Sequence, residues 1–321
     1  MRVAYLDYLK IFACFSVILL HVSAGFWVKG GLDFDWFLVT IVRCSTVMGV
    51  PLFFMISGAL YLSKPIGSIL DFYKKVCASY ILPLFAALIV YKIHMLIHVP
   101  GEPIFSGLLY DIRMTAGYHL WYMWAFFGLL LITPILRLIA SNKNACGLFC
   151  GLSLFFIFLQ NVGTGFPIDN QLFMYPAGYF MAGHYIHNYY NNKFSKKHLF
   201  VCVVASIFGV VLYTYLMSIE VSKPVEKGLG GDYILVAIAS VACFALFKGT
   251  FRQSAFDVKF ISSSTFFIYL YHVLIMSYLP LFFDSSSFIL SITLEVPVIF
   301  TLGLALRKFG RMIPFIKVII P

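Results

Sequence analysis

Charged residues are scarce in this chain of 321 residues. Asp, Glu, Lys and Arg make up 11% of it, whereas 61% of the residues are hydrophobic and the mean hydropathy is +0.93. Soluble globular domains carry about 25% charged residues. The scarcity of charge therefore excludes a soluble globular protein and predicts an all-α, polytopic membrane protein, since a lipid-spanning helix satisfies its own backbone hydrogen bonds.

Several chemical signatures are also missing. The sequence contains no Gly-rich phosphate-binding loop, no internal repeat and no loop long enough to form a separate soluble domain. Its seven cysteines are scattered, without CxxC or Cys/His metal spacing, so no metal site is expected. We therefore expect one membrane-embedded domain over residues 1–321, with any chemistry placed among the helices or at their ends.

Long apolar runs are what the sequence does contain. Cutting it where charges, Gly, Pro and Asn cluster leaves ten runs near the length that a bilayer core requires. These runs cover residues 5–28, 36–62, 74–97, 118–140, 146–162, 171–190, 198–218, 231–249, 258–281 and 286–306. About ten transmembrane helices are expected. The first is expected to be retained, because ionisable residues interrupt the apolar core that a signal peptide would need.

Basic residues divide unevenly between the two sets of loops. With the N-terminus inside, sixteen Lys and Arg residues lie on its side of the membrane and four on the opposite side. Because Lys and Arg are retained on the cytoplasmic side of short loops, both termini are expected in the cytoplasm. The formal charge of +10 then follows from topology, and no nucleic-acid partner is needed to explain it.

The first run, LDYLKIFACFSVILLHVS, holds three ionisable residues, Asp7, Lys10 and His21. Ionisable residues inside a span are costly and are therefore candidates for function. Lys10 and His21 are eleven residues apart, which places them within about 20° of one helix face and roughly 16 Å apart along it. Lys10 alone would also serve as a topology anchor, and a buried histidine can simply satisfy a neighbour's hydrogen bond. A cation at the cytoplasmic mouth and a deeper imidazole suit coenzyme A, whose phosphates would stay at the mouth while its thioester reaches inward.

Five stretches of the sequence resemble, in order, elements of the membrane acyltransferase-3 family. The first run is similar to the family's opening helix, in which an Arg behind an Asp is followed, after ten residues, by a His. The later stretches are VPLFFMISGALYL, FYKKVCASYILP, YHLWYMWAFFGLLLITPIL and STFFIYLYH. They resemble the family's FF-x-x-SG signature, its basic segment and proline before the third span, its fourth-span pattern and its late S-x-x-IYL-x-H element. The residues that carry the match are Asp7, Lys10, His21, Phe53, Phe54, Ser57, Gly58, Lys74, Lys75, Pro83, His119, Leu120, Trp121, Pro134, Thr265, Ile268, Tyr269, Leu270 and His272.

The resemblance implies an integral-membrane O-acyltransferase, in this family usually an O-acetyltransferase. Its donor would be cytoplasmic acyl-CoA, chiefly acetyl-CoA, and its acceptor a hydroxyl of a cell-envelope glycan or lipid-linked saccharide. Within the family, the chain most resembles the short branch that includes the enterobacterial common antigen O-acetyltransferase. A multi-pass protein of the bacterial cytoplasmic (inner) membrane is therefore expected. Two departures from the family are Lys10, which lacks the bidentate fork of the usual Arg, and Thr265, which replaces a Ser and keeps its hydroxyl.

The first helix supplies the expected catalytic groups. His21 is expected to be the general base of a direct transfer or, as an alternative, a nucleophile that carries the acyl group. Asp7 lies about 21 Å of helix from His21, so its expected partner is Lys10, three residues on. In this interpretation, Lys10 with Lys74 and Lys75 holds the phosphates of the acyl carrier.

The remaining candidates each have a structural alternative. Arg43 is a possible donor-site residue, with a salt bridge to Asp7 or Glu295 as the alternative. Ser57 and Thr265 are candidate oxyanion donors, although a hydroxyl more often bonds back to its own helix. The last three candidates are His119 and Trp121, expected to contact the glycan or to lie in an interfacial aromatic belt, and His272, expected to be a second polar group in the channel or an interhelical hydrogen bond.

A second functional class stays open at this stage. In a transporter or glycolipid flippase, Asp7, Arg43, His21 and Glu295 would form an ion or proton relay. Against this reading, the sequence has no inverted repeats or paired half-helices of the kind that transporters contain.

Overall fold

The structure is a computed structural model. It describes residues 2–65, 67–99, 118–163, 175–191, 193–226, 228–251, 253, 256–281, 287–314, 317 and 319–321. Within these ranges the regular structure is helical and no strand occurs. The expectation of an all-α membrane protein is confirmed, because eight helical units are long and apolar enough to cross a bilayer.

Nine of the ten expected runs coincide with apolar helices. The eight long units are α1 (Ala4–Lys29), α2 with α3 (Phe34–Thr46 and Gly49–Tyr61), α4 with α5 (Ile69–Val76 and Leu82–His98), α7 (Trp121–Ala140), α8 (Lys143–Asn161), α10 (Lys196–Val221), α12 (Lys259–Tyr278) and α13 with α14 (Phe288–Leu290 and Val296–Gly310). The shorter α11 spans Ile234–Thr250. The expected run at 171–190 contains α9 (Tyr175–Tyr189), and its first residues, 171–174, lie outside the described residues.

Three of the long units consist of two helices each, and a proline lies close to the junction between the two helices. Pro51 is in the first turn of α3, just after the junction with α2. Pro83 begins α5 after the π-helical turn Cys77–Ile81, and Pro297 begins α14 after the π-helical turn Ser291–Glu295. A proline has no N–H to donate to the preceding turn and its ring crowds that turn. The hydrogen-bond register therefore shifts at each of these points.

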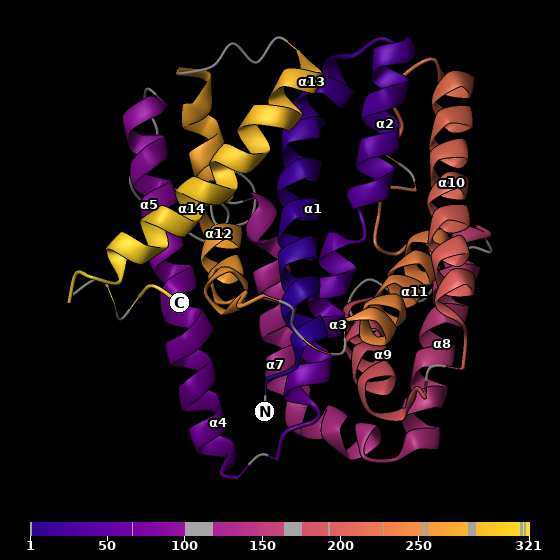
Figure 1. The fold of residues 1–321 in the computed structure, drawn as a ribbon, viewed down its shortest axis with the longest axis vertical. Helices are drawn as coiled ribbons and strands as arrows, with labels where there is room; N and C mark the ends of the chain where they lie inside the picture. Colours follow the sequence, from indigo (N-terminus) through magenta and orange to yellow (C-terminus); the bar gives the residue numbers. More distant parts are fainter. Residues whose placement is uncertain are drawn as a thin grey trace.

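Helix α1 stands in the middle of the bundle (Figure 1). It packs against α2, α3, α11, α12 and α14, and Leu9 and Ala13 on its length are fully buried. The helix that carries Lys10 and His21 is therefore surrounded by protein over much of its surface.

Helices α3 and α9 approach each other through a reciprocal pair of glycines. A Cβ atom placed on Gly58 would overlap the backbone of Phe180 in α9, and one placed on Gly183 would overlap the backbone of Met55 in α3. Small residues of this kind let helix backbones come into direct contact in membrane proteins. The contact fixes the position of α3, which contributes to the wall of the site described below.

Replacing Gly183 by Ala is expected to destabilise the bundle. The added methyl group meets backbone rather than a flexible side chain, so the helices must separate, at a cost of roughly 1–3 kcal/mol. Thermal unfolding of the detergent-solubilised protein, followed by circular dichroism, measures the effect. Gly151→Ala in α8 is the matched control, because nothing lies within 4 Å of its Cβ position. Equal melting temperatures for the two variants would contradict the close-packing argument.

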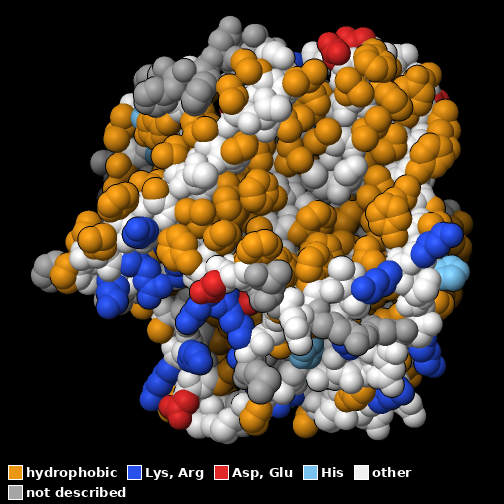
Figure 2. All heavy atoms as spheres, viewed as in Figure 1, with side chains coloured by type: hydrophobic (Ala, Val, Ile, Leu, Met, Phe, Trp, Pro, Cys, Tyr) orange, Lys and Arg blue, Asp and Glu red, His pale blue; other side chains and the backbone are white. Residues whose placement is uncertain are grey.

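Polar and apolar side chains separate along the long axis of the molecule. On the face seen in Figure 2, hydrophobic side chains cover the upper and middle parts, whereas Lys and Arg gather in the lower half. Both chain ends also lie in the lower half of the same view (Figure 1). By the positive-inside rule, the lower end is the expected cytoplasmic end.

Candidate active site

Three histidines from distant parts of the chain meet inside the bundle. His21 comes from α1, His119 from the short turn Tyr118–Leu120 before α7, and His272 from α12. The ring centroid of His272 lies 5.1 Å from that of His21 and 4.9 Å from that of His119, and the rings of His21 and His119 are 6.1 Å apart. We call these three residues the histidine cluster. All three were candidates in the sequence, but nothing in their spacing predicted that they would form one cluster.

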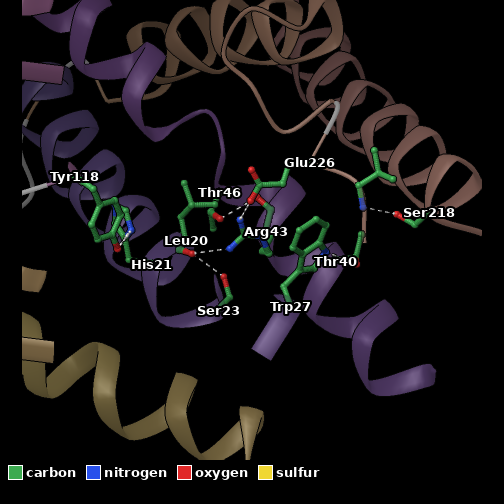
Figure 3. A network of polar contacts seen from close by, with 11 residues as sticks. Leu20, His21, Ser23, Trp27, Thr40, Arg43, Thr46, Tyr118, Ser218 and Glu226 are labelled. Atoms are coloured by element: carbon green, nitrogen blue, oxygen red, sulfur yellow. Dashed lines mark hydrogen bonds and ion pairs between the residues drawn. The ribbon is translucent and has the colours of Figure 1, made fainter. Parts of the chain in front are cut away.

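Hydrogen bonds hold each ring of the cluster. His21 Nδ1 lies 3.1 Å from the hydroxyl of Tyr118 (Figure 3). His272 Nδ1 is 2.8 Å from the carbonyl oxygen of Tyr269, and His119 Nε2 is 3.4 Å from the carbonyl oxygen of Leu270. Within the described ranges, no group of three or more His, Cys, Asp or Glu side chains is placed to hold a metal ion.

A series of three cavities runs along α1 past the cluster. The inner cavity, about 480 Å³, is lined by Lys10 and Tyr269 among others. The central cavity, about 820 Å³, is lined by Tyr269, His21 and His119. The outer cavity, also about 820 Å³, is lined by His21, Lys29 and Asp33. Tyr269 thus borders the inner and central cavities, and His21 borders the central and outer ones.

The inner cavity brings together several of the candidates from the sequence. Lys10, Ser57 and Thr265 all line it. Lys10 is half-buried, and no hydrogen bond or ion pair joins its ammonium group to any other residue that the structure describes. Arg311, which follows α14, lines the same cavity. Sequence analysis did not single out Arg311, because it lies outside every motif and 301 positions from Lys10.

Lys74 and Lys75 are placed differently from Lys10. Both are exposed on α4, and Lys74 lies 3.9 Å from Asp71 on the same helix. Neither side chain lines the inner cavity. In this conformation, the structure does not bring them together with Lys10.

The predicted pairing of Asp7 with Lys10 is wrong. Asp7 Oδ2 pairs with Arg2 Nε at 2.5 Å, and Asp7 Oδ1 accepts a hydrogen bond from Ser262 Oγ of α12, also at 2.5 Å. Asp7 is 6% exposed, and a buried carboxylate requires such partners. Asp7 therefore fastens the start of α1 to α12. Ser262 itself lines the inner cavity, so this link lies beside the candidate donor site.

Arg43 lies at the histidine end of α1 rather than beside Lys10 (Figure 3). Its Nη1 donates to the carbonyl oxygen of Leu20 at 3.1 Å, and its guanidinium stands 5.0 Å over the ring of Trp27. Its ion-pair partner is Glu226, at 4.0 Å, and the alternative pairing with Asp7 is wrong because Asp7 binds Arg2. Leu20, which Arg43 contacts, lies about 15 Å along α1 from Lys10, which does not favour a shared phosphate.

The remaining candidates divide between two cavities. The hydroxyl of Thr265 donates to the carbonyl oxygen of Ser262 at 2.9 Å, which is the structural alternative considered for it, whereas Ser57 lines the inner cavity together with Tyr122. Trp121 is half-exposed and lines the central cavity together with His119. Both stand where a molecule in that cavity would contact them.

Comparison with known proteins adds one finding. Residues 3–307, nearly the whole chain, match a family model described as an acyltransferase domain. The matched range contains the histidine cluster and every candidate residue described above except Arg311. Neither a curated protein nor a solved structure matches the chain.

Proposed function

The chain belongs to the acyltransferase-3 family and is a membrane acyltransferase, and from that premise we propose an O-acyltransferase that acts across the bilayer. It takes an acyl group, chiefly acetyl, from acyl-CoA in the inner cavity. It transfers the group to a hydroxyl of a cell-envelope glycan or lipid-linked saccharide that enters by the outer cavity. The observation that carries this proposal is that His21 borders both the central and the outer cavity, so donor and acceptor can meet at its ring.

The inner cavity suits the donor. Coenzyme A carries anionic phosphates at one end of a long, nearly neutral arm. Lys10 and Arg311 supply cations to this cavity, and the Lys10 ammonium group forms no hydrogen bond or ion pair with any described side chain. Phosphate contacts of this kind are charge-assisted and stronger than neutral hydrogen bonds. The arm would extend past Tyr269 toward His21.

The outer cavity suits a polyhydroxylated acceptor. Asp33 and Asp35, which line it, offer carboxylate oxygens that accept hydrogen bonds from sugar hydroxyls. In the expected orientation this cavity faces away from the cytoplasm. We therefore place the protein in the bacterial cytoplasmic membrane and keep the enterobacterial common antigen branch as a prediction.

Direct transfer needs one proton to move. As the acceptor oxygen bonds to the thioester carbon, His21 removes the hydroxyl proton. The carbon–sulfur bond then breaks, and the proton passes to the thiolate, so that the products are the ester and free coenzyme A. General-base catalysis by a histidine contributes roughly 10²–10⁴-fold to such a reaction. We favour this route over an acyl-histidine because the central cavity, into which the donor arm would extend, and the outer cavity both reach the same ring.

The transporter alternative loses one residue of its proposed relay. Its relay required Asp7, but Asp7 is bound to Arg2 and Ser262 at the opposite end of α1 from Arg43. The family assignment also supports an enzyme. We therefore do not pursue that alternative.

Transfer of label from acetyl-CoA tests the proposal. Membranes with and without the protein are incubated with acetyl-CoA labelled in its acetyl group, and the lipid-linked saccharide and polysaccharide fractions are counted separately. We expect label in one of these fractions only when the protein is present. Equal label in both membranes, for acetyl-CoA and for longer acyl-CoA donors alike, would overturn the proposal.

A further inference from the structure

The buried ring of His272 has one nitrogen without a hydrogen-bond partner among the described residues, and this atom points to a second residue of the reaction centre. We propose that His272 accepts a hydrogen bond from His21 when His21 holds the proton of the acceptor, and so stabilises and orients the imidazolium. His272 touches neither substrate in this scheme and is a positioning residue. The inference rests on the proposed function, in which His21 is the base.

The hydrogen bonds of His272 fix its tautomer. Its Nδ1 lies 2.8 Å from the carbonyl oxygen of Tyr269, and a carbonyl oxygen can only accept, so Nδ1 carries the hydrogen. In a neutral imidazole the other nitrogen is then a bare acceptor. That atom, Nε2, is buried and has no hydrogen-bond partner among the described residues. Buried polar atoms are nearly always paired, so an unpaired one requires an explanation.

Two rings are close enough to His272 to supply the missing hydrogen, His21 at 5.1 Å and His119 at 4.9 Å between centroids. Because Nε2 of His119 faces the carbonyl oxygen of Leu270 and carries its hydrogen, Nδ1 of His119 is a bare acceptor, and His21 is the donor.

The rings of His21 and His272 have centroids 5.1 Å apart and planes inclined by 44°. Two imidazoles joined by an N–H···N bond have centroids about 5 Å apart, since each nitrogen lies about 1 Å from its ring centre. His21 is therefore at hydrogen-bonding separation and needs only to rotate. The hydroxyl of Tyr118 lies against its Nδ1. When the acceptor hydroxyl takes that place, Nδ1 is the base, and Nε2 carries the ring hydrogen that is donated to His272.

His119 is a weaker candidate for the same role. Its Nε2 faces the carbonyl oxygen of Leu270, and its Nδ1 is also buried without a partner among the residues that the structure describes. However, its ring lies 6.1 Å from that of His21, beyond the separation for a direct bond. It also lines the central cavity, where a bound molecule can satisfy Nδ1. His272, which is 1% exposed, lines none of the three cavities, so a molecule bound in them does not reach its Nε2.

The proposed contact adds no reactant to the transfer. The acceptor hydroxyl takes the place of the Tyr118 hydroxyl, and its proton moves to Nδ1 of His21 as the new carbon–oxygen bond forms. His21 then donates a hydrogen bond to His272 Nε2 while the carbon–sulfur bond breaks. The same proton finally passes from His21 to the departing thiolate. His272 keeps its own Nδ1 hydrogen on the Tyr269 carbonyl throughout.

Two substitutions at position 272 separate this role from a structural one. In His272→Asn, the amide nitrogen can occupy the place of Nδ1 and keep the bond to Tyr269, but the acceptor at Nε2 is lost. In His272→Gln, the amide group reaches the place of Nε2 and can accept from His21, but the bond to Tyr269 is lost. We expect kcat to fall about 10-fold or more in the Asn variant, the value of a hydrogen bond to a charged group. KM for acyl-CoA should not change, and the Gln variant should retain more activity than Asn.

The outcomes are distinct. A purely structural role for His272 predicts the opposite order, with Asn more active than Gln, and that result would overturn the inference. A wild-type kcat in the Asn variant would overturn it as well. If the wild-type protein transfers label and requires His21, such results refute only the role of His272. If the wild type transfers no label, the proposed function itself has failed.

A spectroscopic measurement tests the tautomer without any activity. Nitrogen-15 resonances of histidine rings differ between protonated and bare nitrogens, and the signals of His272 are identified as those missing from His272→Asn. We expect a protonated Nδ1 and a bare Nε2 in the resting protein. A hydrogen on Nε2 would remove the acceptor and overturn the inference.

Discussion

Replacing His21 by Ala is expected to lower acyl transfer by roughly 10²–10⁴-fold, the contribution of a positioned general base. The imidazole borders the central and outer cavities, and a methyl group at this position leaves no base that borders both, because His119 lines only the central one. KM for acyl-CoA should change little, because the phosphates would bind at the far end of the inner cavity. The measurement is the initial rate of transfer by purified protein over a range of acyl-CoA concentrations.

A matched control for this variant is His184→Ala. His184 is also a buried histidine, with Nε2 3.2 Å from the carbonyl oxygen of Ala140 and Nδ1 3.2 Å from Ser63, and it lines none of the three cavities. Loss of activity in both variants would indicate loss of packing rather than of a base. Retained transfer in a well-folded His21→Ala protein would remove His21 from the mechanism.

The Lys10→Ala variant is expected to bind acyl-CoA roughly 10- to 100-fold more weakly, because a charge-assisted hydrogen bond contributes about 1.5–3 kcal/mol. Lys10 makes no hydrogen bond or ion pair with a described residue, and the nearby carboxylate of Asp7 is bound to Arg2 and Ser262, so removal of Lys10 acts chiefly on the ligand. Lys10→Arg should bind at least as well as the wild type, since the guanidinium fork suits a phosphate. Isothermal titration with coenzyme A measures the affinities.

Lys143→Ala serves as the charge-matched control, since Lys143 is exposed at the start of α8 and lines none of the three cavities. It removes the same charge from the same side of the protein. Equal affinity in Lys10→Ala and Lys10→Arg would argue against a phosphate contact. A Lys10→Ala protein that fails to insert, while Lys10→Arg inserts normally, would instead support the alternative of a topology anchor.

The sequence by itself determined the helices and the alignment of the candidate residues Lys10 and His21 along one of them. Each apolar run must form its backbone hydrogen bonds within itself in lipid, so the existence and approximate ends of the spans are local properties. The placement of Lys10 and His21 along one helix is local as well, because helical geometry converts their spacing into a direction and a depth. The five family-like stretches identified the chemistry for the same reason, since each is readable within a single segment.

Only the tertiary structure decided which groups meet. The histidine cluster joins positions 21, 119 and 272, and Asp7 binds Ser262, 255 positions away. Arg43 pairs with Glu226, which lies in the loop after α10. Arg311 joins Lys10 in the inner cavity only through the path of the last helix. These contacts depend on how the helices pack and cross, as at the glycine pair of α3 and α9. Such contacts join segments that are distant in the sequence, so they cannot be predicted from the spacing of residues within a single segment.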